Sequence, residues 1–94
     1  MMEKIEEYDV HTERGLHGTV GIYQDVDQDD FVAEYSLAEL VPLRKPGTGR
    51  NIPKLNPKVG TLRDKEKDQL IEKCKKELTK DGDTIEYFER RSNL

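Results

Sequence analysis

The sequence predicts a single small α+β domain in which an antiparallel sheet is followed by an amphipathic helix. Residues 18–26 and 31–37 alternate apolar and polar side chains, a pattern typical of strands with one buried face. Residues 61–82 instead place apolar side chains at helical spacing. The 94 residues suffice for one hydrophobic core but not for two, so strands and helix are expected to share it.

The composition indicates a thin core and a heavily solvated surface. Only 22 residues are Leu, Ile, Val or Phe, whereas 38% of the chain is charged. A single cysteine excludes an intrachain disulfide, and no apolar run approaches the roughly 18 residues of a membrane helix. The start, MMEKIEEYDV, has no signal-peptide core. We therefore expect a cytoplasmic protein with no membrane association and no cofactor.

The first elements expected are three strands. An edge strand within residues 6–12 would use Tyr8 and Val10. The two alternating segments would then pair as an antiparallel hairpin, because the polar residues 27–30 between them have the length of a hairpin loop. After the hairpin, Ser36 and Glu39 form a capping-box pattern for a single helical turn. Pro42 would end that turn, and the residues around it can form a short closing strand.

A family resemblance follows from the same residues. The stretch ERGLHGTVGIYQDVDQDDFVAEYSLAELVPL, residues 13–43, resembles the small SH3-like barrels of the KOW type. This resemblance implies a five-stranded barrel used for binding rather than catalysis. We expect the barrel from about residue 5 to 60, with barrel strands in residues 5–43 and the final strand drawn either from residues 44–60 or from the tail. KOW domains often contact RNA, ribosomal proteins or transcription proteins through basic loops. The matching positions are Gly15, Leu16, Gly18, Thr19, Val20, Leu40, Pro42 and Leu43.

The second half predicts a helix over residues 61–82 and a short tail element over 83–94. Thr61 is the expected N-cap and Gly82 the expected stop. The tail suits either a short helix or an edge strand. The apolar stripe of the helix is narrow, so the helix is expected to pack on the barrel. The stripe consists of Leu70, Ile71, Cys74 and Leu78.

A basic segment, residues 44–60, joins the two halves. It carries a net charge of +5, whereas residues 1–43 carry −9 and residues 61–94 are neutral overall. The segment lacks the G-x-x-x-x-G-K-[ST] spacing of a P-loop. Two interpretations stay open: a tether held against the acidic half, or a site for an anionic partner. Its cations are Arg44, Lys45, Arg50, Lys54 and Lys58.

Metal and catalytic sites find little support. Residues 25–36 begin like an EF-hand loop, but Asp30 replaces the required glycine and Ser36 the final glutamate, so a solvated hairpin tip is expected. No helical or hairpin spacing aligns His11 with His17, which are expected at the surface. Cys74 lies on the apolar stripe and should act as a small hydrophobe. We therefore expect no enzyme and no metal.

The function predicted from these features is protein recognition by a small adaptor or regulator, of a size and composition found in phages and mobile elements. The partner is expected to present a basic surface. The alternative is a KOW-like module that binds RNA or DNA through the cations of residues 44–58. A homo-oligomer is a third interpretation. The expected protein contacts are exposed tyrosines and the acidic hairpin tip: Tyr23, Asp27, Asp29, Asp30, Tyr35 and Tyr87.

Overall fold

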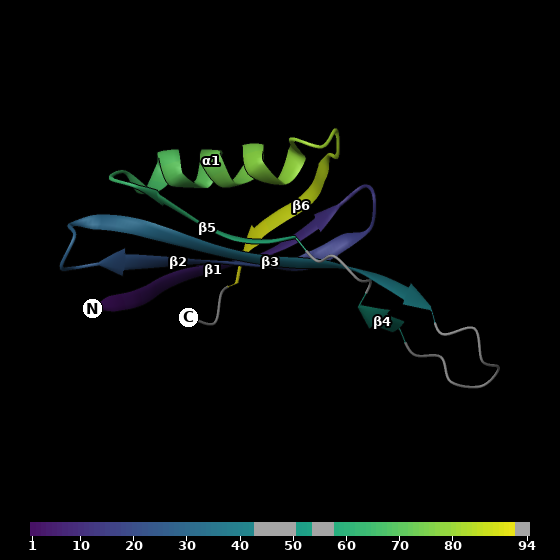
Figure 1. Cartoon of the computed structure of the whole chain (residues 1–94), viewed down its shortest axis with the longest axis horizontal. Helices are drawn as coiled ribbons and strands as arrows, with labels where there is room; N and C mark the ends of the chain where they lie inside the picture. The colour runs from purple at the N-terminus through teal and green to yellow at the C-terminus, as the bar shows by residue number, and fades with distance from the viewer. Residues whose placement is uncertain (43–50, 54–57, 92–94) are drawn as a thin grey trace.

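The computed structural model describes residues 1–42, 51–53 and 58–91 (Figure 1). Six strands and one helix follow one another in the order β1–β2–β3–β4–β5–α1–β6. Their bounds are β1 Met2–Thr12, β2 Leu16–Asp25, β3 Asp30–Pro42, β4 Asn51–Pro53, β5 Lys58–Asp64, α1 Lys67–Thr79 and β6 Ile85–Arg90.

All strand pairings are antiparallel. The strands lie side by side in the order β6–β1–β2–β3–β5, and β4 pairs with the far end of β3. The helix α1 lies across one face of this sheet and leaves the other face open (Figure 1). The predicted α+β class, an antiparallel sheet with one helix, is confirmed.

The predicted hairpin is confirmed as β2 and β3. Val20 pairs with Tyr35 and Ile22 with Ala33, so the alternating apolar residues of both strands share one face. In the connecting turn, the carboxylate of Asp25 accepts hydrogen bonds from the backbone amides of Asp27 and Gln28, at 3.2 and 3.3 Å. This side-chain bonding to the following amides is the reason why aspartate suits such a turn.

The core lies between the sheet and α1. The predicted stripe is confirmed, because Leu70, Cys74 and Leu78 are completely buried and Ile71 is partly buried against the same cluster. The sheet contributes small and branched apolar side chains from its three central strands, which form a flat surface for the helix. These are Val10, Val20, Ile22, Ala33, Tyr35 and Leu37.

The helix is shorter than predicted. Residues 58–64 form strand β5, which pairs with β3 from Leu37↔Lys58 to Phe31↔Asp64, so Thr61 is not a helix N-cap. The helix begins only at Lys67, and Leu70 is its first buried residue. Pairing satisfies the outer backbone groups of β3, and this gain outweighs the weak helical pattern of residues 61–66.

Three further predictions are wrong or resolved. Residues 36–41 do not form a helical turn, because β3 continues through them. Ser36 and Leu37 instead alternate as exposed and buried residues between two neighbouring strands. The ambiguous tail forms strand β6, which pairs with β1. Since β1 thus has neighbours on both sides, it is not an edge strand.

Candidate functional site

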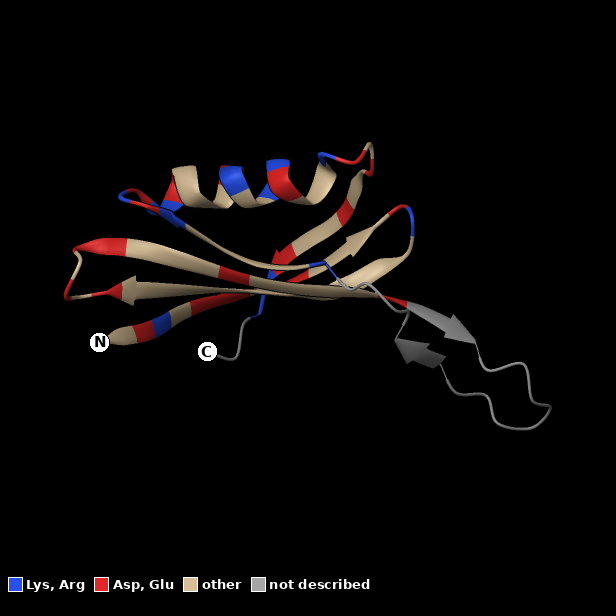
Figure 2. Ribbon diagram, in the orientation of Figure 1, with Lys and Arg blue, Asp and Glu red and all other residues tan. Residues whose placement is uncertain are grey.

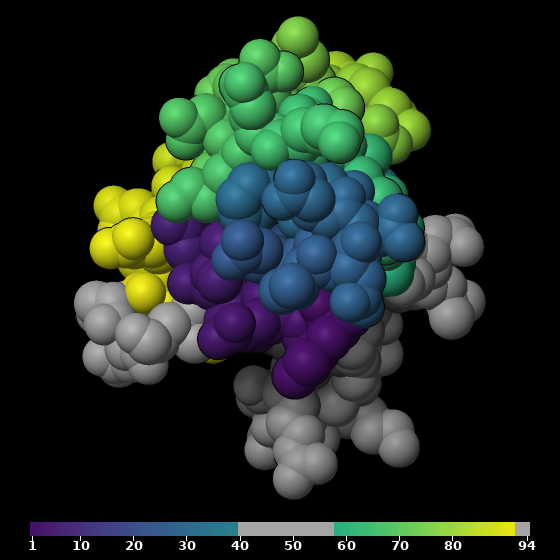
Figure 3. Space-filling model, turned by 90° about the vertical axis from the view of Figure 1, so that its left-hand side faces the viewer, coloured from purple at the N-terminus to yellow at the C-terminus, as the bar shows by residue number. Residues whose placement is uncertain are grey.

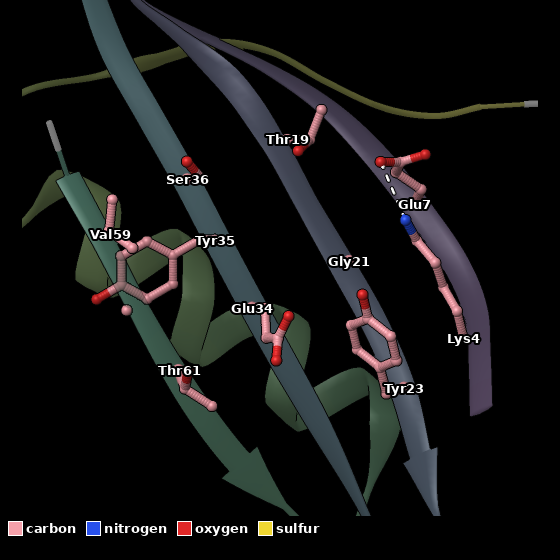
Figure 4. Close-up of a pocket in the computed structure, with 11 residues that line it drawn as sticks. Lys4, Glu7, Thr19, Gly21, Tyr23, Glu34, Tyr35, Ser36, Val59 and Thr61 are labelled. Atoms are coloured by element: carbon pink, nitrogen blue, oxygen red, sulfur yellow. Dashed lines mark ion pairs between the residues drawn. The ribbon is translucent and has the colours of Figure 1, made fainter. Parts of the chain in front are cut away.

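A groove of about 240 Å³ crosses the open face of the sheet (Figure 4). Tyr23 of β2 lies on one side and Val59 of β5 on the other, with β3 between them. Its lining residues come from four strands: Lys4, Glu7, Thr19, Gly21, Tyr23, Glu34, Tyr35, Ser36, Val59, Gly60 and Thr61.

The hollow depends on a residue without a side chain. A Cβ atom at Gly21 would lie 3.1 Å from Cε1 of Tyr23 and 3.5 Å from Cε of Lys4. Because that atom is absent, the ring of Tyr23 lies back along β2 toward Gly21 (Figure 4). The tyrosine therefore forms a wall of the groove with its ring, and its hydroxyl lies over Gly21.

Glu34 stands at the centre of the groove. It pairs with Gly21 on β2 and with Thr61 on β5. The first of these neighbours has no side chain and the second has a short one. Within the described part of the chain its carboxylate has no hydrogen-bond or ion-pair partner, and Figure 4 shows it standing clear of the neighbouring side chains. The side chain is exposed to solvent.

Other carboxylates of this face are neutralised. At one end of the groove, Glu7 binds Lys4 at 3.2 Å and Arg91 at 3.3 Å, and Arg91 also binds Asp9 at 2.9 Å. Glu34 therefore differs from these acids, because no cation in the described part of the chain pairs with it.

A second ion-pair cluster lies at the opposite end of the face. Arg63 binds both Asp25, at 3.1 Å, and Asp30, at 3.0 Å. Burial opposes the ionisation of Asp25, but hydrogen bonds from Arg63 and from the amide of Gln28 hold the pKa of its carboxyl below the ordinary value. This cluster joins the β2–β3 hairpin to β5.

The residues predicted as protein contacts do not form one cluster. Tyr23 lines the groove, and Tyr87 lies on β6 next to His11, with 40% of its surface exposed. Asp27 and Asp29 are exposed at the hairpin tip, beyond the ion pair of Asp30. Figure 3 shows this hairpin end between the helix and the N-terminal strand.

The prediction that Tyr35 is exposed is wrong. Only 7% of Tyr35 is accessible, because its ring packs on the helix side of the sheet with Cys74 and Leu78. Burial is the main reason why the pKa of Tyr35 is raised. Tyr35 is two residues from both Ala33 and Leu37, and alternate residues of a strand lie on the same face. This spacing therefore indicates that Tyr35 lies on the buried, apolar face.

Most of the basic segment, namely Arg44, Lys45, Arg50 and Lys54, lies outside the described residues. Lys58 begins β5 and binds Asp81, just beyond the helix, at 2.9 Å and the carbonyl of Leu78, in the last turn of the helix, at 3.2 Å. The prediction that the cations of this segment face the acidic half is therefore wrong for Lys58.

Cations of the C-terminal third instead pair with acids of the first half, and Figure 2 shows where basic and acidic residues lie along the ribbon. The carboxylate of Glu6 forms ion pairs with Lys67 at 2.7 Å and with Arg90 at 3.5 Å. Arg63 and Arg91 form the further pairs with acids of the first half that are described above. Opposite charges in the two halves of the sequence thus meet across the sheet and between sheet and helix.

The histidines are aligned, contrary to the prediction. His11 and His17 are cross-strand partners of β1 and β2, with ring centroids 4.3 Å apart. The short turn between the strands brings them into register. The described residues nevertheless contain no group of three His, Cys, Asp or Glu side chains suited to a metal ion.

Cys74 is fully buried, as its place on the apolar stripe predicts. Burial, with a smaller effect of nearby Glu77, raises the pKa of its thiol to about 11. The thiol is therefore protonated and shielded at neutral pH, the opposite of what a nucleophilic cysteine requires.

Sequence reasoning missed Glu34, Lys4 and Thr61 as site residues. Glu34 is the one charged residue in the alternating segment 31–37, and that contrast is a usable signal. Thr61 could not have been found, because its segment was assigned to the helix.

No protein-family model, curated protein or solved structure matches this chain. No helix in the described ranges is long and apolar enough to cross a membrane.

Proposed function

We propose that the protein is a non-catalytic recognition module that binds another protein through the open face of its sheet. The observation that carries this proposal is the asymmetry of the sheet. One face is covered by α1, whereas the other presents a groove with the carboxylate of Glu34 at its centre, which has no ion-pair partner among the described residues.

The chemistry of this face suits a protein surface. Val59 is 63% exposed and Tyr87 40% exposed, so the groove and its surroundings offer apolar and aromatic contacts. Exposed Asp29 at the hairpin tip and Glu34 add negative charge, which complements a basic partner, whereas Asp27 is already paired with the N-terminal ammonium group. A mixture of exposed aromatic and charged side chains is typical of protein interfaces.

A binding role is also favoured by the exposure of the groove. General acid–base catalysis needs a titratable group held against its substrate, usually away from bulk water. Glu34 is exposed, and the two other charged groups that line the groove, Lys4 and Glu7, are bound to each other. This arrangement supports recognition of a macromolecule rather than chemistry on a small one.

The KOW-type barrel stays part of the proposal. Its support is that Gly18, Thr19 and Val20 lie in the strand β2, as that resemblance requires, and that β2 leads through an acidic turn into β3. A closed barrel would need a further pairing between β6 and the opposite edge of the sheet.

Photo-cross-linking tests the proposed surface. A benzophenone amino acid is placed at Thr61, on the open face, or at Gln69, on the exposed surface of α1. Each variant is irradiated in a lysate of the source cells, and half of each sample is treated with nuclease. We expect one identified protein to cross-link at Thr61 in both halves and not at Gln69, and the purified partner to bind this chain.

Other outcomes would overturn the proposal. Nuclease-sensitive cross-links would favour the KOW-like alternative, in which the cations of residues 44–58 bind RNA or DNA. Charge reversal at all five of those cations should then abolish binding, and the affinity should fall steeply with salt. Cross-links only between copies of the chain would instead indicate a homo-oligomer.

A further inference from the structure

We infer that the groove receives a single basic side chain of the partner, lysine or arginine, with the carboxylate of Glu34 as its counter-ion. This inference rests on the proposed function and specifies what the open face recognises.

Charge complementarity is the first argument. The groove contains three ionised side chains, and two of them, Lys4 and Glu7, neutralise each other at 3.2 Å. Glu34 is therefore its one uncompensated charge among the described residues. A partner cation placed there would form a charge-assisted hydrogen bond without breaking an existing ion pair.

The shape of the site is the second argument. The volume of about 240 Å³ lies below the roughly 300–1,000 Å³ of pockets for drug-sized ligands, so it suits one side chain better than a cofactor. The short residues Gly21 and Thr61 flank Glu34 and leave its carboxylate accessible.

The lining matches a long cationic side chain. Val59 and the ring of Tyr23 can contact the aliphatic stem of a lysine or arginine. Hydrogen-bond acceptors surround the place where the charged head would lie. They are the carboxylate of Glu34 and the hydroxyl groups of Thr19, Tyr23, Ser36 and Thr61.

Titration with blocked amino acids, followed by amide NMR at low salt, tests this inference. The probes are the N-acetyl methylamides of lysine, arginine and norleucine, the last of which has a similar stem without charge. We expect saturable shifts at the amides of Gly21, Glu34 and Thr61 with lysine or arginine, and at least about threefold weaker binding of norleucine. The stronger of the two cationic probes identifies the side chain.

Two variants and one control test the role of Glu34. Glu34→Gln should lower the binding affinity of the cationic probes about threefold to tenfold. Thr61→Lys places an ammonium group directly across from Glu34 and should abolish probe binding. Glu72→Gln removes an equivalent exposed carboxylate from α1 and should change nothing. The amide spectrum of each variant shows whether it is folded.

The inference is overturned if norleucine binds as well as lysine and arginine, if none of the probes binds, or if Glu34→Gln leaves their affinity unchanged. In any of these cases a protein cross-linked at Thr61 would still support the proposed function. Conversely, the cationic probes could bind while the cross-linker at position 61 captures no protein. This outcome would support a site for a basic side chain but contradict protein recognition by the whole face.

Discussion

Gly18 of β2 lies so close to Ser36 of β3 that a Cβ atom at Gly18 would be 1.9 Å from the carbonyl oxygen of Ser36. The same atom would lie 2.7 Å from the Cα atom of Leu37. Both obstacles are backbone atoms, so a rotation of a side chain cannot relieve the clash. The two strands that carry most of the groove can therefore pack this closely only because residue 18 is glycine.

We therefore expect Gly18→Ala to destabilise the protein by about 3 kcal/mol, because the strands must move apart. Urea unfolding measures this loss. Gly15→Ala is the matched comparison: no atom lies within 4 Å of its Cβ position, and its cost comes from a φ of +94° alone. A smaller loss at Gly18 than at Gly15 would contradict the close approach of β2 and β3.

Glu6 should make stability depend on acidic pH. Burial raises the pKa of Glu6, but hydrogen bonds from Lys67 and Tyr8 outweigh it and leave that pKa below the ordinary 4.5. Ionised Glu6 therefore stabilises the fold above pH 4.5, and this contribution disappears as the pH falls through its lower folded-state pKa.

Glu6→Gln should accordingly cost about 1–3 kcal/mol at pH 7, where Lys67 and Arg90 lose their counter-ion, and much less near pH 3. Urea unfolding at both pH values provides the measurement, with Glu72→Gln as a surface control. Equal losses at the two pH values would show that charge at Glu6 is unimportant.

Asp83 connects the β1–β2 turn to the segment before β6. Its Oδ1 accepts hydrogen bonds from the amides of Arg14, at 3.1 Å, and of Thr84, at 2.8 Å, and its side chain is buried. We expect Asp83→Ala to cost about 1–3 kcal/mol and to speed hydrogen exchange at these two amides. Asp83→Asn keeps the acceptor and should lose less. Unchanged exchange in the alanine variant would rule out this connection.

The thiol of Cys74 should be unreactive in the folded protein. Its pKa of about 11 and its complete burial both suppress attack on a disulfide reagent at pH 8. We expect reaction with an aromatic disulfide to proceed at the rate of transient opening and to become fast in denaturant. Rapid reaction of the folded chain would mean that α1 does not pack against the sheet at this residue.

The sequence by itself determined the hairpin β2–β3 and the buried side of α1. Period-two alternation around Val20 and Tyr35 has only one face that can be buried, and the spacing of Leu70, Cys74 and Leu78 leaves one side of the helix for the core. Both patterns are local, so the buried face of each element can be predicted without knowledge of the neighbouring elements.

Only the tertiary structure decided that residues 58–64 and 85–90 are strands and that Ser36 and Glu39 do not start a helical turn. Their local patterns allow either structure, and the choice depends on backbone pairing with β3 and β1. The groove has the same origin. Gly21, Glu34 and Thr61 are far apart in the chain, and they meet because hydrogen-bond register aligns residues across strands, which spacing along one strand cannot specify.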